Sequence, residues 1–191
     1  MPLITGPAAE PITLADAKLH LRVDADITDF DTTLAALISA ARSQAEHRTG
    51  RRFGVQTWEH VMDVFPAGPI ILPAPPVTAV VSIKYDDPAG AEQTLALADY
   101  RARTAGEPAV LRPVTAWPAS LGEEGAVRIR YTCGLTSADP RWPALQAWML
   151  LAIGAWHANP EAVSAAQTYA LPRSFHDGLL DALIHYGTST L

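Results

Sequence analysis

The chain has 191 residues, a net charge of −6 at pH 7 and a pI near 5.4. This acidic balance argues against a protein whose main task is to grip nucleic acid phosphates, because such proteins carry basic faces. Cys133 is the single cysteine, which excludes an internal disulfide, and the most apolar run, residues 147–156, is about half as long as the roughly 20 residues that a membrane-spanning helix needs.

Three prolines within residues 1–12 predict an extended arm at the start of the chain. Two helices are predicted to follow it. Thr13 followed by Asp16 is the pattern of a capping box and predicts the start of a short helix. This helix is expected to end before an acidic connection at residues 22–26. A long helix is predicted from Ile27 to Thr49, because apolar residues recur at spacings of three and four: Ile27, Phe30, Leu34, Leu37, Ile38, Ala41 and Ala45. Acidic residues at its start and basic residues toward its end suit the helix dipole, and Gly50 suits its C-terminal cap.

Residues 53–134 change to the two-residue period of β-strands and contain Pro- and Gly-rich connections. Strands are predicted at 55–65, 70–72, 77–87, 93–97, 100–103, 109–112 and 126–134. In the strand from Val77, the alternation places one set of residues on a common face: Val77, Ala79, Val81, Ile83 and Tyr85. In the last strand the apolar set is Val127, Ile129, Tyr131 and Cys133.

Helices return after residue 134. One is predicted from the Asp139-Pro140 pair to the Asn159-Pro160 pair, with a strongly apolar face, and another from about residue 172 to His185. The fold class is therefore α+β: a helical bundle formed by the N- and C-terminal helices, with an inserted antiparallel β module. The expected division is 1–52 for the arm and helical pair, 53–134 for the β module and 135–191 for the C-terminal helices and tail.

The sequence predicts no catalytic, cofactor-binding or metal site. The six histidines lack the i, i+4 spacing of a helical zinc site. Ser174, His176 and Asp177 are neighbours on one predicted helix and would point in different directions, so they cannot align as a triad. The Gly-rich stretch at 122–125 reads GEEG and would repel phosphate.

A helix-turn-helix over residues 13–49 is the alternative interpretation of the helical pair. The N-terminal end of a recognition helix meets bases and phosphates, yet here it carries Asp26, Asp29 and Asp31. The basic cluster at residues 48–52 lies at the opposite end, where it also complements the helix dipole. Trp117 lies in a proline-flanked loop and suits an interface or a small core equally.

The order of several segments resembles the head–tail connector (adaptor) proteins of tailed phages, a family that includes the adaptors of gene transfer agents. The resemblance covers about residues 10–186. The segments that carry it are EPITLADAKLHLRVD, the long helix ending in HRTGRRF, QTWE, LPAPPVTAVVSIKYDDPAGAEQTL, VRIRYTCG and PALQAWMLLAIGAWHANPEAV.

The resemblance implies a structural role without catalysis, cofactor or membrane contact. Such adaptors form a ring, usually twelve-fold, under the portal in the neck at the capsid vertex. They extend the DNA channel without binding DNA specifically and dock a stopper or tail-completion protein. The chain would be made in the bacterial cytoplasm and work in the virion or phage-like particle.

Three sets of residues are candidates for contacts in this role. The C-terminal segment is expected to contact the portal through Phe175, Leu179, Leu183, His185, Tyr186 and Leu191. The subunit interface is expected to use Arg42, Arg48, Arg51, Arg52 and Trp117. Glu123 and Glu124 are expected to line the channel, where carboxylates repel DNA phosphates. A stopper or tail-completion protein of the same neck, a small acidic DNA-binding regulator and an enzyme with a non-obvious site remain alternatives.

Overall fold

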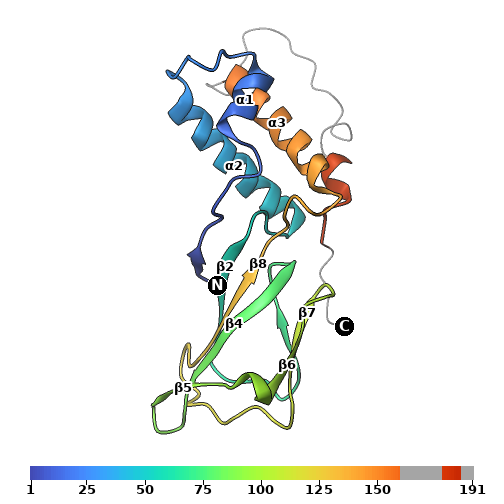
Figure 1. Ribbon diagram of the computed structural model, residues 1–191. Helices are drawn as coiled ribbons and strands as arrows, with labels where there is room; N and C mark the ends of the chain where they lie inside the picture. The colour runs from blue at the N-terminus through green and yellow to red at the C-terminus, as the bar shows by residue number, and fades with distance from the viewer. Residues whose placement is uncertain (160–177, 186–191) are drawn as a thin grey trace. The chain divides into compact units, whose positions relative to one another are not determined.

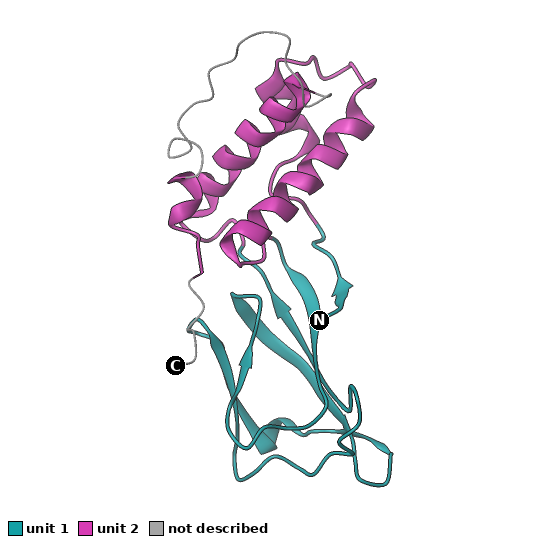
Figure 2. Ribbon diagram, turned by 180° about the vertical axis from the view of Figure 1, so that it is seen from behind, with its two compact units in different colours: residues 1–8, 54–135, 187–191 teal, residues 9–53, 136–186 magenta. Residues whose placement is uncertain are grey.

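The computed structural model describes residues 1–159 and 178–185, which divide into two compact units (Figures 1 and 2). The β unit comprises residues 1–8 and 54–135, drawn in teal in Figure 2, and the helical unit comprises the described parts of 9–53 and 136–186, drawn in magenta. The mixed α+β class predicted from the sequence is confirmed.

The helical unit contains α1 (Leu14–Leu21), α2 (Asp31–Thr49) and α3 (Trp142–Ala158). The predicted capping box is present: the Thr13 hydroxyl accepts a hydrogen bond from the Asp16 amide at 3.1 Å, and the Asp16 carboxylate accepts one from the Thr13 amide at 3.2 Å. Gly50 ends α2 with a φ of 68°, a left-handed conformation that glycine adopts at little cost.

The core of the helical unit lies where α2 and α3 pack together, with α1 against both. The spacing of three and four brings the buried side chains of each helix onto one face: Leu34, Ile38, Ala41 and Ala45 of α2, and Leu145, Trp148, Met149, Ala152 and Ile153 of α3. Each large side chain among them contributes roughly 1.5–3 kcal/mol by its burial. This confirms the predicted bundle of N- and C-terminal helices.

The start of α2 differs from the prediction by four residues, Asp31 instead of Ile27. The Lys18 ammonium donates to the carbonyl of Ile27 at 2.8 Å and to that of Ala25 at 3.4 Å, so these carbonyls are bound by a side chain of α1. Ile27 and Phe30 are consequently outside the apolar stripe, 41% and 44% exposed.

The β unit contains a five-stranded antiparallel sheet in the order β1-β2-β8-β4-β5. Its strands are β1 (Leu3–Thr5), β2 (Gln56–Met62), β4 (Val77–Asp86), β5 (Glu92–Thr94) and β8 (Val127–Cys133). The central strand β8 pairs with β2 on one side and β4 on the other. Residues 1–8 of the predicted arm thus belong to this unit, because β1 pairs with β2, whereas residues 9–12 of the arm belong to the helical unit.

A second, three-stranded sheet has the order β3-β7-β6, made of β3 (Ile70–Leu72), β7 (Ala109–Pro113) and β6 (Tyr100–Arg103), with the 3-10 turn η1 (Leu97–Asp99) before β6. Buried residues of both sheets form one hydrophobic cluster, which includes Ile70, Leu72, Tyr100 and Leu111 from the small sheet and Ile83, Val127, Ile129, Tyr131 and Cys133 from the large one. The apolar face predicted for β8 is confirmed.

The alternation predicted for β4 is wrong in its middle. The register against β8 shifts between Val77 and Ala79 and again between Val80 and Ser82. Val80 therefore packs against the cluster, whereas Val81 is 56% exposed and Ala79 is exposed. Extra residues of this kind invert the side-chain alternation locally, and the second shift restores it before Ile83.

The predicted C-terminal helix is only partly within the described residues. Residues 178–181 are helical, and 182–185 are not, so the helix ends four residues before the predicted His185. The His185 amide instead donates to the Thr49 carbonyl at 2.7 Å. Residues 172–177 of the prediction lie outside the described chain.

Candidate assembly surfaces

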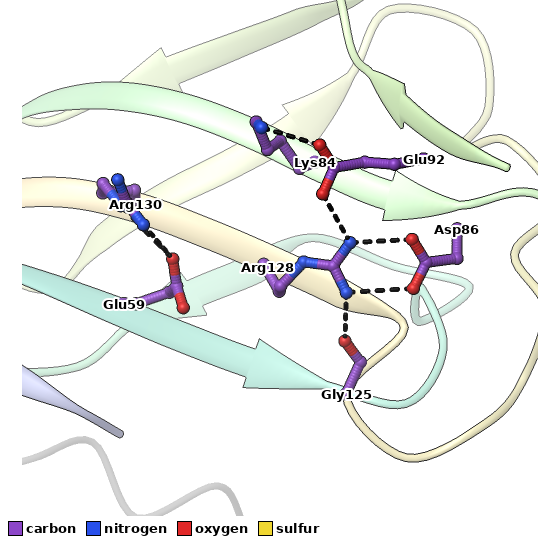
Figure 3. A network of polar contacts seen from close by, with 7 residues as sticks. All are labelled: Glu59, Lys84, Asp86, Glu92, Gly125, Arg128 and Arg130. Atoms are coloured by element: carbon purple, nitrogen blue, oxygen red, sulfur yellow. Dashed lines mark hydrogen bonds and ion pairs between the residues drawn. The ribbon is translucent and has the colours of Figure 1, made fainter.

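The outward face of the five-stranded sheet carries a network of ion pairs (Figure 3). Arg128 of β8 is its centre: its two terminal nitrogens contact the two carboxylate oxygens of Asp86 at 2.9 and 2.7 Å. One of them also contacts Glu92 at 3.1 Å, and Lys84 holds the other oxygen of Glu92 at 2.7 Å. Nearby, Arg130 pairs with Glu59 across the β8–β2 ladder at 2.9 Å.

These contacts shift the acids toward their charged forms. The hydrogen bond from Arg128 lowers the pKa of Asp86 below its ordinary value, and the hydrogen bond from Lys84 does the same for the pKa of Glu92. The six charges of this face, three of each sign, therefore compensate one another within the chain. These ion pairs join β2, β4, β5 and β8.

An acidic loop, residues 121–125, lies beside the β4–β5 hairpin. The Leu121 amide donates to the Asp86 carbonyl at 2.8 Å, and the Gly125 amide donates to the Asp63 carboxylate at 3.0 Å. These bonds fix both ends of the loop, and Glu123 and Glu124 between them are exposed. The two candidate channel residues thus stand in a part of the β unit that already carries other acids.

The arginines predicted for the subunit interface are engaged within the helical unit. Arg42 lies between Glu10 at 2.7 Å and Glu46 at 3.1 Å, while Arg52 is 3.9 Å from Glu46. The guanidinium of Arg48 lies 5.7 Å from the ring centroid of Trp148, and buried Arg51 donates to the Leu183 carbonyl at 2.5 Å. Charge pairing and cation–π contact make these side chains part of this unit's own packing.

Trp117 likewise has partners inside the β unit. Its ring stacks on that of Phe65 at 5.2 Å between centroids, with 7° between the planes. Its indole nitrogen donates to the Gly68 carbonyl at 2.9 Å, which satisfies the polar end of a half-buried ring. Of the two roles that the sequence left open for Trp117, an interface or a small core, these contacts support the core.

The predicted portal-contact residues differ in burial, and only three of them lie within the described chain. Leu183 is fully buried in the helical unit, whereas Leu179 and His185 are half-buried. Phe175, Tyr186 and Leu191 lie outside the described residues.

One surface was missed by the sequence reasoning. Arg101 and Arg103 of β6 and Arg112 of β7 are all exposed on the outward side of the three-stranded sheet. The signal was present in two segments. YRAR alternates arginine with apolar residues, and in AVLRP the apolar Ala109 and Leu111 alternate with Val110 and Arg112, as a strand with one buried face requires.

Two kinds of site are absent from the described chain. Within residues 1–159 and 178–185, no group of three His, Cys, Asp or Glu side chains is placed to hold a metal ion. In the same ranges, no helix combines the length and the apolar content needed to cross a bilayer.

Comparison with known proteins gives one family and several structures. The model of the phage gp6-like head-tail connector protein family matches residues 11–93. No curated protein sequence matches the chain significantly.

Three of the solved structures that match are chains from gene transfer agent (GTA) particles. A chain from the virion of a native GTA particle matches at 20% identity with a TM-score of 0.77, covering 100% of this chain and 96% of that one. Chains from the neck of an empty particle, computed with C6 symmetry, and from the neck of a native particle, computed with C12 symmetry, match with TM-scores of 0.73 and 0.69 at 20% and 21% identity. Both comparisons cover 100% of this chain and 98% of the other.

The predicted resemblance is therefore confirmed: the sequence pattern of the phage gp6-like head-tail connector family runs through residues 11–93, and the fold of the chain is one found in gene transfer agent particles.

Proposed function

We propose that this protein is a structural adaptor in the neck of a tailed phage or phage-like particle, where it forms a ring under the portal and extends the DNA channel. The observation that carries the proposal is the full-length fold match to neck proteins of gene transfer agents, together with the connector pattern in residues 11–93. The role depends on shape and contact, and it uses neither a catalytic group nor a cofactor.

A ring of identical subunits needs a heterologous interface, in which one surface of each subunit fits a different surface of the next. Twelve copies is the number we propose, and the C12 and C6 symmetries of the matched necks support it, since a twelve-fold ring satisfies both. The portal lies on one side of this ring and a stopper or tail-completion protein on the other.

The acidic loop is the proposed lining of the channel. Exposed Glu123 and Glu124 repel DNA phosphates and keep the duplex from adhering as it passes. Replacing both with Lys in particles is expected to retain DNA in the neck and slow its ejection. Normal packaging and ejection by that variant would show that these residues do not face DNA.

The C-terminal segment is the proposed contact with the portal, through Phe175, Leu179, His185, Tyr186 and Leu191. Leu183 is buried, so its part in this contact is to support the segment from within. Deletion of residues 186–191 is expected to weaken portal attachment without lowering the thermal stability of the helical unit. Unchanged attachment would refute this assignment.

Electron microscopy of the purified protein mixed with the portal of its particle tests the main proposal. A ring stacked on the portal is expected. Binding to tail components in pulldown without binding to portal would identify a stopper or tail-completion protein instead. Salt-dependent binding to duplex DNA, with no affinity for either neighbour, would favour a regulator.

A further inference from the structure

The outward side of the three-stranded sheet is a basic surface on an acidic protein. Arg101 of β6 lies directly opposite Arg112 of β7, and Arg103 lies opposite Val110, which in turn pairs with Ile71 of β3. The three arginines are exposed, Ile71 is 47% exposed and Val110 is half-buried. We call these five residues the arginine face.

The arginine face has charges that the described chain does not compensate. Within residues 1–159 and 178–185, none of its arginine side chains makes a hydrogen bond or ion pair. Like charges directly opposite each other on neighbouring strands destabilise a sheet. The other face of the β unit shows the contrast, because there every guanidinium and ammonium group in Figure 3 has a carboxylate partner.

A complementary surface lies at the turn between α1 and α2 of the helical unit. Asp24, Asp26 and Asp29 are exposed there, and none of their carboxylates has a bonding partner in the described chain. Ile27 lies between Asp26 and Asp29 in the sequence, and Phe30 follows Asp29; their side chains are 41% and 44% exposed. We call these five residues the acidic elbow.

The acidic elbow is held in one conformation by its own contacts. Lys18 binds the carbonyls of Ala25 and Ile27 and pairs with Asp31 at 2.5 Å. The Phe30 ring lies edge-on to His157 of α3, with 5.6 Å between ring centroids. A fixed surface loses little conformational entropy when it binds.

We infer that the arginine face of one subunit binds the acidic elbow of the next copy, and that this contact is the heterologous interface of the ring. The inference rests on the proposed function. Both surfaces combine three charges with exposed large apolar side chains, and the charges have opposite signs. Because the two surfaces are unlike, each copy offers one to each neighbour, as ring closure requires.

A second copy fits the arginine face better than DNA does. Phosphates require cations, and Ile71 and Val110 would contribute nothing to binding them. An interface core is depleted in charge and rich in apolar contact, with the charges at its rim. The elbow supplies both components, and the net charge of −6 opposes DNA binding elsewhere on the chain.

Two charge-reversed full-length variants test the contact. One carries Arg101→Glu, Arg103→Glu and Arg112→Glu, and the other carries Asp24→Arg, Asp26→Arg and Asp29→Arg. Assembly, alone and on portal rings, is measured by native mass spectrometry and electron microscopy. Each variant alone is expected to need at least about tenfold more protein to assemble than the wild type, because three exposed pairs become repulsive.

Mixing the two variants is the decisive step. The acidic face of the Arg→Glu variant then meets the basic elbow of the Asp→Arg variant. At the next interface of an alternating ring, the unchanged arginine face of the Asp→Arg variant meets the unchanged acidic elbow of the Arg→Glu variant, so this contact is complementary as well. Equal amounts are therefore expected to restore assembly, with the two variants alternating. Arg→Lys at positions 101, 103 and 112 is the control, and this variant is expected to assemble as the wild type does because it keeps the three positive charges. Thermal melting verifies that every variant is folded.

The outcomes separate this inference from the proposed function. If the wild type assembles and both reversed variants do so equally well, or if mixing restores nothing, the inference is wrong while the ring stands. If the reversed arginine variant assembles normally but loses salt-dependent binding to duplex DNA, the arginine face is a phosphate-binding surface. If the wild type assembles neither alone nor on portal, the proposed function fails as well.

Discussion

Lys18→Met is expected to destabilise the helical unit strongly, because Lys18 is a nearly buried charge that joins α1 to the elbow. Its side chain is 8% exposed, and its ammonium group pairs with Asp31 at 2.5 Å and donates to the Ile27 carbonyl at 2.8 Å. The Asp31 Oδ1 atom is buried and makes no hydrogen bond within the described residues, so the Lys18 charge compensates it. Methionine keeps the length of the aliphatic stem and removes only the charge and its hydrogen bonds.

The expected loss is about 3 kcal/mol of unfolding free energy. A hydrogen bond made by a charged donor contributes roughly 1.5–3 kcal/mol, and removing one partner of a fully buried ion pair costs roughly 3–5 kcal/mol. The second value must be reduced here, because the Asp31 side chain is 31% exposed and water can partly solvate it. The two contributions overlap, so their sum is not the estimate.

Lys84→Met is the matched control, since Lys18 and Lys84 are the two lysines of the chain. Lys84 pairs with Glu92 at 2.7 Å, but the two side chains are 46% and 50% exposed. An exposed pair of this kind contributes little to stability because water solvates both charges, so a much smaller loss is expected than for Lys18→Met. Urea unfolding followed by far-ultraviolet circular dichroism, which reports the helices, measures both variants. Losses that agree within about 0.5 kcal/mol would refute the claim that Lys18 holds the elbow.

Three further outcomes are expected. Gly134→Ala should lower the unfolding free energy of the β unit by roughly 3 kcal/mol or more, or prevent its folding. Gly134 has a φ of 126°, and an added Cβ would lie 1.9 Å from the carbonyl oxygen of Gly54. A melting temperature like that of the wild type would contradict this prediction. Tyr131→Phe should cost about 1 kcal/mol, since the hydroxyl of this buried side chain donates to a backbone carbonyl at 2.9 Å, and no change in urea midpoint would show that the bond is dispensable. Asp139 has its pKa lowered from 3.8 to about 2 by hydrogen bonds from Arg141, so wild-type stability should fall as pH drops from about 4 to 2, and Asp139→Asn should flatten that fall in acid titrations followed by circular dichroism.

Local chemistry explains which elements were predictable. The capping box of Thr13 and Asp16 and the left-handed Gly50 depend on contacts within a few residues, and both are present as expected. The alternation of Val127 to Cys133 is also local, because β8 is the regular central strand. Each of these signals is complete within its own segment of the sequence.

The predictions that were wrong concern the start of α2 and the alternation in β4, and both depend on residues in other elements of the chain. Lys18 occupies backbone carbonyls of the elbow, and this delays the start of α2 until Asp31. The register shifts of β4 are defined only against β8, about fifty residues later in the chain, and they expose Val81 although its sequence position suggested burial. A periodic pattern cannot reveal an extra residue until the partner strand is known.

Functional arginines are hard to identify from the sequence for the same reason: the sequence does not show which arginine has a partner within the fold. Arg42 and Arg128 face carboxylates of their own units, so their charges serve the fold. Arg101 and Arg112 face each other instead, a cost to the isolated sheet that a second copy with exposed acids would relieve. The sequence analysis named four arginines in and just after the long helix for the subunit interface, together with Trp117: Arg42, Arg48, Arg51 and Arg52. The pairing of side chains in space favours the arginine face for our proposal, since a charge that is already paired within the fold has less interaction energy available for a partner than an unpaired one.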